Sequence, residues 1–202
     1  MAYPTVSAPY GLKPVNLIGG QVFAGQVRQM EIADGYATGI FNGDLVKRAS
    51  TGYVQKDTGT TTATPCGVFL GCSFVNASTG QPQFQQYWPA STTIASGSKA
   101  YAFVADDPDT LFKVAVVSGT TVIAGYGITL IGNNIALVQN AGSTTTGDSA
   151  VAVDGTTAAT TNTLPIRVID VVRDTSTAAD EFVELIVKIN AGMHQYNNAT
   201  GV

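Results

Sequence analysis

The sequence is poor in charge: aspartate, glutamate, lysine and arginine make up 12% of its 202 residues, against about 25% in an average domain. The ten basic residues never cluster, and Lys47-Arg48 is the densest pair. Because nucleic acids are bound through their phosphates by basic patches, this pattern excludes direct DNA or RNA binding. A surface with few charges loses little solvation on burial, which favours a chain that packs against other chains.

Long apolar runs are also missing. No stretch of 18 consecutive apolar residues occurs, so the sequence predicts no membrane span. The first residues, Met1 to Pro4, lack the basic start and apolar centre of a signal peptide. We therefore expect a protein that is made in the cytoplasm and has no membrane partner.

Histidine is almost absent, with His194 the single example. A serine or cysteine triad needs a rigidly held histidine as its base, whereas His194 follows the last predicted strand and is better interpreted as a surface or packing residue. The sequence contains no zinc-protease, phosphate-loop, nucleophile-elbow or dinucleotide-binding motif. We therefore predict a non-enzymatic protein with no catalytic residue and no cofactor.

Two cysteines are too few for a disulfide-stabilised fold. Cys66 and Cys72 fall on one face of a predicted strand, which separates their Cα atoms by about 20 Å at ~3.3 Å per residue. A disulfide needs less than about 7 Å. The spacing favours two buried free thiols; a bridge would require a tight reversal at Gly67 or Gly71.

Three aspartates, Asp106, Asp107 and Asp109, share one predicted turn. Clustered carboxylates can bind a hard cation through oxygen. A calcium loop, however, has longer alternating ligands and a final glutamate, and both are missing here. The composition favours a solvated turn with Pro108 at a corner position, so we predict no metal site.

Most of the chain alternates apolar and polar residues, and no segment has a helical period with a capped start. Short β-branched and aromatic runs are separated by polar turns, a pattern typical of sandwiches and barrels. We predict an all-β fold, a sandwich or small barrel of about ten to twelve short antiparallel strands. A tight hairpin turn is expected at 42–44, and hairpins are expected to pair 99–105 with 111–117, 122–130 with 134–138, and 164–174 with 181–190.

Three parts of the chain are expected. Residues 1–20 carry three prolines at five-residue spacing, which predicts an extended N-terminal arm. The arm is also apolar, so it lies either along a neighbouring chain or on its own domain. Residues 21–190 are predicted to form the all-β domain and residues 191–202 a tail. Within the domain, the low-complexity stretch 141–163 is either a flexible linker or a flat, half-buried strand.

Residues 66–89 hold both cysteines and the only tryptophan. The alternation in 66–74 predicts a core strand, with Cys66, Val68 and Cys72 on one face. The polar stretch 76–86 is the better candidate for a surface that meets another chain. Ile186, on the outward side of the last strand, also lacks a reason to face solvent. The candidate subunit-contact residues are Tyr3, Tyr10, Leu12, Val15, Leu17, Gln81, Gln83, Phe84 and Ile186.

Several short motifs carry a family resemblance: YGLKPV (10–15), GVFLGC (67–72), YWPA (87–90), YAFVADDP (101–108), TTAATTNTLP (156–165) and LIVKIN (185–190). With these motifs the chain resembles virion structural proteins of short-tailed phages that infect marine and cyanobacterial hosts. The resemblance implies a capsid structural or decoration (cement) protein, often trimeric, placed on the head surface over junctions between major capsid subunits.

We therefore expect a non-enzymatic capsid decoration protein, assembled in the host cytoplasm and located on the virion. Its expected partners are the major capsid protein and copies of itself in a homotrimer. The alternative is a host-binding module, fibre-like or adhesin-like, in which Tyr53, Tyr87 and Trp88 stack on sugars. For Trp88 a core position beside Pro89 is favoured.

Overall fold

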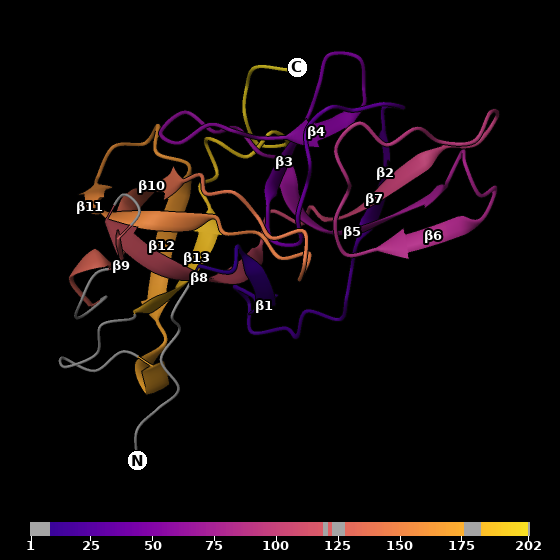
Figure 1. The fold of residues 1–202 in the computed structure, drawn as a ribbon. Helices are drawn as coiled ribbons and strands as arrows, with labels where there is room; N and C mark the ends of the chain where they lie inside the picture. Colours follow the sequence, from indigo (N-terminus) through magenta and orange to yellow (C-terminus); the bar gives the residue numbers. More distant parts are fainter. Residues whose placement is uncertain (1–8, 119–120, 123–127, 176–182, 202) are drawn as a thin grey trace.

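The computed structural model describes residues 9–118, 121–122, 128–175 and 183–201. Within these ranges the fold is all-β, with thirteen strands and two short 3-10 helices (Figure 1). The strands form two sheets, one on the left and one on the right of the view. The predicted all-β fold is therefore confirmed, with slightly more strands than expected.

The first sheet closes on itself. Its strand order is β1-β8-β11-β10-β12-β13, and β13 pairs back to β8, so five strands from β8 to β13 form a small barrel. Strands β1 and β9 pair only with β8. The elements are β1 (Lys13–Leu17), β8 (Thr110–Ser118), β9 (Thr121–Val122), η1 (Ile128–Leu130), β10 (Asn134–Val138), β11 (Ala152–Ala159), β12 (Ile166–Val171), η2 (Arg173–Thr175) and β13 (Glu184–Ile189).

The second sheet has the order β3-β4-β2-β7-β5-β6, and β3 also pairs with β5. Strand β6 pairs only with β5 and therefore lies at an edge. The strands are β2 (Arg28–Ile32), β3 (Leu45–Arg48), β4 (Val54–Lys56), β5 (Gly67–Val75), β6 (Pro82–Gln85) and β7 (Ala100–Ala105).

Two clusters of buried side chains support these sheets. The barrel core is largely aliphatic and takes residues from both sheets, so the sheets pack as one unit. The second core lies within the second sheet and holds the larger aromatic side chains. The barrel core comprises Leu12, Leu45, Ala63, Val68, Ala105, Phe112, Val114, Val116, Ile135, Leu137, Val151, Val153, Ile166, Val168, Val171, Val183, Leu185, Val187 and Ile189. The second core comprises Met30, Ile32, Ile40, Val46, Val54, Cys66, Phe69, Cys72, Phe74, Trp88, Ala100, Ala102 and Val104.

One of the three predicted hairpins is confirmed: β12 pairs antiparallel with β13. The hairpin predicted for 99–105 and 111–117 is wrong, because β7 belongs to the second sheet and β8 to the first. The chain crosses between the sheets at residues 106–109. The hairpin predicted for 122–130 and 134–138 is also wrong in its described part, since β10 pairs with β11 and β12 while residues 128–130 form a 3-10 turn.

The strand over residues 66–74 does not present one face as predicted. Val68 packs in the barrel core, whereas Cys66 and Cys72 pack in the second core. The pairing register between β5 and β7 shifts between Phe69 and Gly71, which marks a β-bulge. A bulge inserts an extra residue and reverses the alternation that follows, which places Cys72 on the opposite side from Val68. Cys66 precedes β5, so the alternation of the strand does not fix its side.

Residues 9–17 of the predicted arm pack on their own domain, which is one of the two expected arrangements. Strand β1 pairs with β8, and Leu12 is fully buried in the barrel core. The stretch 141–163 contains β11, so the strand interpretation is confirmed there and the linker interpretation is wrong for its second half.

A tight turn at Asn42, Gly43 and Asp44, here called the junction turn, joins the two sheets. The predicted turn is confirmed, since the amide of Asp44 donates to the carbonyl of residue 41 at 2.9 Å. Its flanks do not pair with each other as a hairpin: Ile40 bridges to residue 88 and Leu45 pairs with residue 68.

Backbone hydrogen bonds of the junction turn reach both sheets. The Gly43 carbonyl accepts from the amide of Leu12, just before β1, at 2.9 Å. The Gly43 amide donates to the carbonyl of Phe69 on β5 at 2.8 Å. Gly43 has φ of 98°, and a Cβ at this position would lie 3.0 Å from the Cα of Gly11. Both the left-handed backbone and the close approach require glycine here.

The side chain of Asp44 is fully buried at this junction. Its Oδ2 accepts from the amide of Phe41 at 2.9 Å and lies 2.9 Å from the Nζ of Lys56. Its Oδ1 accepts from the hydroxyl of Ser149 at 2.6 Å. A buried carboxylate is tolerated only when it is paired and hydrogen-bonded in this way.

Replacing Asp44 by asparagine is expected to lower the free energy of unfolding by about 3–5 kcal/mol, because the nearly buried ammonium of Lys56 loses its counter-charge. Urea denaturation followed by circular dichroism measures the change. Asp170→Asn is the matched control, since Asp170 pairs with Arg173 at the surface and its loss is expected to cost less than about 1 kcal/mol. Equal effects of the two substitutions would contradict the role of the junction turn.

Candidate functional site

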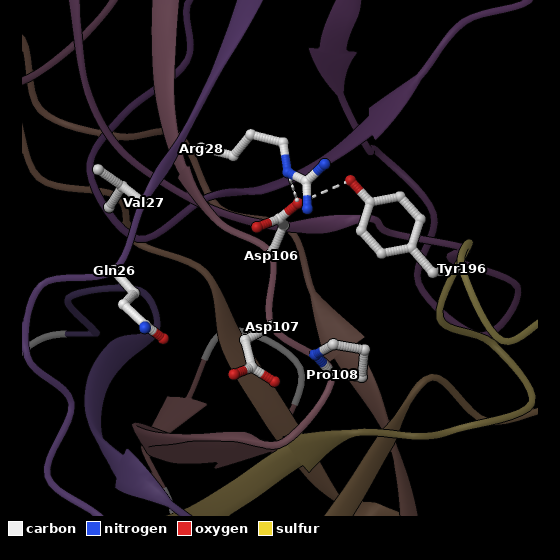
Figure 2. Close-up of a pocket in the computed structure, with 7 residues that line it drawn as sticks. All are labelled: Gln26, Val27, Arg28, Asp106, Asp107, Pro108 and Tyr196. Carbon is white, nitrogen blue, oxygen red and sulfur yellow. Dashed lines mark hydrogen bonds and ion pairs between the residues drawn. The ribbon is translucent and has the colours of Figure 1, made fainter.

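A surface hollow of about 480 Å³ lies where the chain crosses between the sheets (Figure 2). Arg28 at the start of β2 contributes one wall, and Asp106 and Asp107 come from the crossing. Tyr196 from the C-terminal segment closes the other side. The complete lining is Gln26, Val27, Arg28, Asp106, Asp107, Pro108 and Tyr196.

Asp106 organises this hollow. Its Oδ2 lies 2.7 Å from the Nε of Arg28 and accepts a hydrogen bond of 2.8 Å from the hydroxyl of Tyr196. The guanidinium carbon of Arg28 also lies 5.8 Å from the centre of the Tyr196 ring. The carboxylate of Asp106 is largely buried while Arg28 is mostly exposed. The three side chains therefore fasten the C-terminal segment to the crossing between the sheets.

Tyr196 and His194, unlike Arg28, are uncharged at neutral pH. Burial, and secondly the hydrogen bond to Asp106, raise the pKa of Tyr196 to about 12. His194 is fully buried, and its ring lies 5.2 Å from that of Tyr196. Its Nδ1 accepts from the amide of Tyr196 at 3.2 Å, and burial lowers its pKa below the ordinary value. His194 is thus a packing residue, one of the two predicted roles.

The interactions in the hollow hold the C-terminal segment against the crossing between the sheets. The lining residues offer charges, amides and a phenol, but no serine, threonine or cysteine paired with a base. The arrangement that activates a nucleophile is therefore not present in this lining.

The three clustered aspartates point to different partners. Asp106 binds Arg28, Asp107 accepts from the amide of Asp109 at 2.8 Å, and Asp109 pairs with Lys188 at 2.6 Å. The amide of Thr110 also donates to the carbonyl of Asp107 at 3.1 Å, so the predicted turn with Pro108 at a corner position is confirmed. Asp106, which was expected to be solvated with the rest of the turn, is buried. In the part of the chain that the structure describes, no group of three or more acidic, histidine or cysteine side chains could hold a metal ion.

Both cysteines are buried and free, as predicted. Burial raises the pKa of the Cys66 thiol and of the Cys72 thiol to about 12. Both thiols therefore stay protonated at physiological pH and are poor nucleophiles.

The predicted subunit-contact residues divide into three groups. Phe84 is 78% exposed on edge strand β6, Val15 is 43% exposed on β1, and Gln81 is exposed before β6. Leu12 is a wrong prediction, because its side chain is buried in the chain's own core and offers no surface to a neighbour. The half-buried members are Tyr10, Leu17, Gln83 and Ile186, and Tyr3 lies outside the described residues.

Tyr10 and Glu184 form a partly buried contact on the outward side of β13. Glu184 alternates with the inward residues of β13, yet it is 1% exposed. The hydroxyl of Tyr10 donates to its carboxylate, and Lys113 lies 3.2 Å from the same oxygen. The N-terminal segment therefore covers the outward side of β13 at this point.

Three further exposed apolar residues lie just beyond the predicted contact residue Leu17. Ile18 is 49%, Val22 79% and Val27 41% exposed. They lie in the connection between β1 and β2, where polar residues and glycines separate them. The apolar character of the predicted arm indicated Ile18, but nothing in the alternation identified Val22 or Val27.

The three aromatic residues proposed for sugar stacking do not form one surface. Trp88 is fully buried, edge-on to Phe74 with ring centres 5.3 Å apart. Tyr87 stacks on Phe41 at 5.4 Å. Only Tyr53 is exposed. The core position favoured for Trp88 is confirmed.

No known protein family, curated protein or solved structure matches the chain. Among the described residues, no helix has the length and apolar character needed to cross a membrane.

Acid is expected to loosen the fold through His194. Its pKa is lowered in the folded state. Below about pH 6.5 the histidine of the unfolded chain therefore binds a proton more readily than the buried ring does, and the free energy of unfolding decreases as the pH is lowered. The expected slope between about pH 6.5 and 5 is at most ~1.4 kcal/mol per pH unit. Urea denaturation across this range should show a shallower slope for His194→Gln; equal slopes would contradict the assignment.

Proposed function

We propose that this chain is a non-enzymatic decoration (cement) protein that binds the outer surface of a tailed-phage head and stabilises contacts between major capsid subunits. The resemblance of its short motifs to virion structural proteins supports this role. The observation that carries the proposal is the exposed apolar segment, here defined as residues 15–27.

The apolar segment exposes four aliphatic side chains, Val15, Ile18, Val22 and Val27. A Cβ added at its three glycines would meet no atom within 4 Å, so the space around Gly19, Gly20 and Gly25 is open. Figure 1 shows the connection between β1 and β2 running along the outside of the fold. The exposed surface of these side chains does not stabilise the monomer, whereas its burial against a partner is worth at most about 1.5–3 kcal/mol for each side chain.

Edge strand β6 supports a second contact. Its outer side has no strand partner among the described residues, and Phe84 on it is 78% exposed. An open edge can accept an extended segment of another chain through backbone hydrogen bonds. We propose that this edge contributes to contacts between copies of the chain in a homotrimer.

Binding of many copies would stabilise the head by linkage, because the ligand occupies only the assembled shell. Each copy needs only modest affinity, since the contacts repeat over the lattice and within the trimer. An exposed hydrophobic segment with few charges is better suited to packing against a shell of other subunits than to remaining exposed on a freely diffusing protein.

The double substitution Ile18→Ser and Val22→Ser is expected to reduce binding to heads at least tenfold, because two aliphatic side chains no longer bury apolar surface. The measurement is co-sedimentation of the purified chain with heads that were assembled without it. Thermal unfolding should not change, since both side chains are exposed in the free protein.

The matched control for head binding is Ile128→Ser, which removes an aliphatic side chain of 59% exposure outside the apolar segment. Its binding should equal that of the parent chain. If the parent chain does not co-sediment with heads, the proposed function is wrong; if all variants bind equally, the segment is not the contact.

The purified protein should sediment with a mass three times the 20.8 kDa of a single chain. Phe84→Ser is expected to shift it toward the monomer, because the exposed ring at the β6 edge would be buried between copies. Analytical ultracentrifugation distinguishes the two species. If the parent chain is already a monomer at micromolar concentration, the trimer is overturned. If Phe84→Ser sediments as the parent trimer does, the β6 edge is not the contact.

A further inference from the structure

Two hollows flank the exposed ring of Tyr53 on the outer face of the second sheet. The first, of about 420 Å³, is lined by Gln29, Arg48 and Tyr101 among others. The second, of about 270 Å³, is lined by Lys99 and neighbouring polar groups. Tyr53 and Glu31 line both hollows, so the two sites are contiguous. Neither hollow contains a residue of the apolar segment.

Strand alternation produces this surface. On β2, Met30 and Ile32 enter the second core, which turns Gln29 and Glu31 outward. On β7 the buried alanines alternate with outward side chains, and Tyr101 pairs in register with Glu31. At the start of β4 the buried Val54 leaves the preceding Tyr53 exposed on the same face.

The polar groups of the two hollows combine charge pairing with unused hydrogen-bonding capacity. Lys99 and Glu31 form an ion pair with each other, and Arg48 donates to the carbonyl of Gly52 at 3.0 Å. The amide of Gln29 and the hydroxyls of both tyrosines have no hydrogen-bond partner among the described residues. These groups can donate to and accept from a ligand.

We propose that the two hollows bind adjacent rings of a neutral oligosaccharide, with Tyr53 between them. A sugar presents an apolar C–H face to an aromatic ring and hydroxyls to the polar groups at its rim, and both are provided here. A charged ligand fits less well, because the two acidic side chains of the lining, Glu31 and Asp34, equal in number the two basic ones, Arg48 and Lys99. Two separate hollows divided by a ring also fit ring-sized units better than a continuous protein surface does. This inference goes beyond the proposed head-binding function and uses different residues.

The test is a printed array of bacterial-surface oligosaccharides, neutral and acidic, probed with the full-length purified chain. We expect binding to neutral oligosaccharides. Isothermal titration with the strongest array ligand should then show an affinity at least tenfold lower for Tyr53→Ala and for Tyr101→Ala. Ile128→Ala, which shortens an exposed side chain outside both hollows, should bind as the parent chain does, and circular dichroism melts check that all variants fold.

Three results would overturn the proposal: no binding on the array, binding to acidic oligosaccharides alone, or affinity that is unchanged in both tyrosine variants. Head binding should be unaffected by Tyr53→Ala, because Tyr53 lies outside the apolar segment. Failure here is therefore distinguishable from failure of the decoration function.

Discussion

The buried carboxylate of Asp44 is the constraint on which the arrangement of the two sheets depends. It lies in a turn whose backbone bonds both Leu12, ahead of the first sheet, and Phe69 within the second. The charge is balanced by Lys56 at 2.9 Å and hydrogen-bonded by Ser149 at 2.6 Å. Lys56 and Ser149, which come from two distant parts of the chain, must be in place together for this charge to be tolerated. The junction turn thereby selects one relative placement of the sheets.

The same junction decides which part of the N-terminal region is available to a partner. Backbone bonding at Gly11 and Leu12, and pairing of β1 with β8, hold the region up to Leu17 against the domain. Beyond Leu17 the chain makes a long connection to β2 with its aliphatic side chains exposed. A contact surface built this way is anchored at both ends, which reduces the conformational entropy lost on binding.

The sequence predicts those strands and contacts that depend on residues close together in the chain. It does not predict those that depend on residues far apart in the chain. The alternation of β2 and β7 and the pairing of β12 with β13 follow from local period-two patterns. The choice of partner for β8 does not, because a strand of suitable pattern can pair with any of several others. In the candidate site, the exposure of Phe84 follows from its polar surroundings. The bond between Tyr196 and Asp106 joins residues 90 positions apart, and no local signal identifies it.

The low charge of the sequence has a further structural consequence. Among the described acidic residues, Asp44, Asp57, Asp106 and Glu184 are buried within the fold. Each has a basic side chain within 3.5 Å that balances its charge. The outer surface is therefore even poorer in unpaired charge than the composition indicates. Removing water from such a surface costs little, so modest apolar contacts suffice for binding. Charge that stabilises the interior is in this way kept off the faces that we propose to meet other molecules.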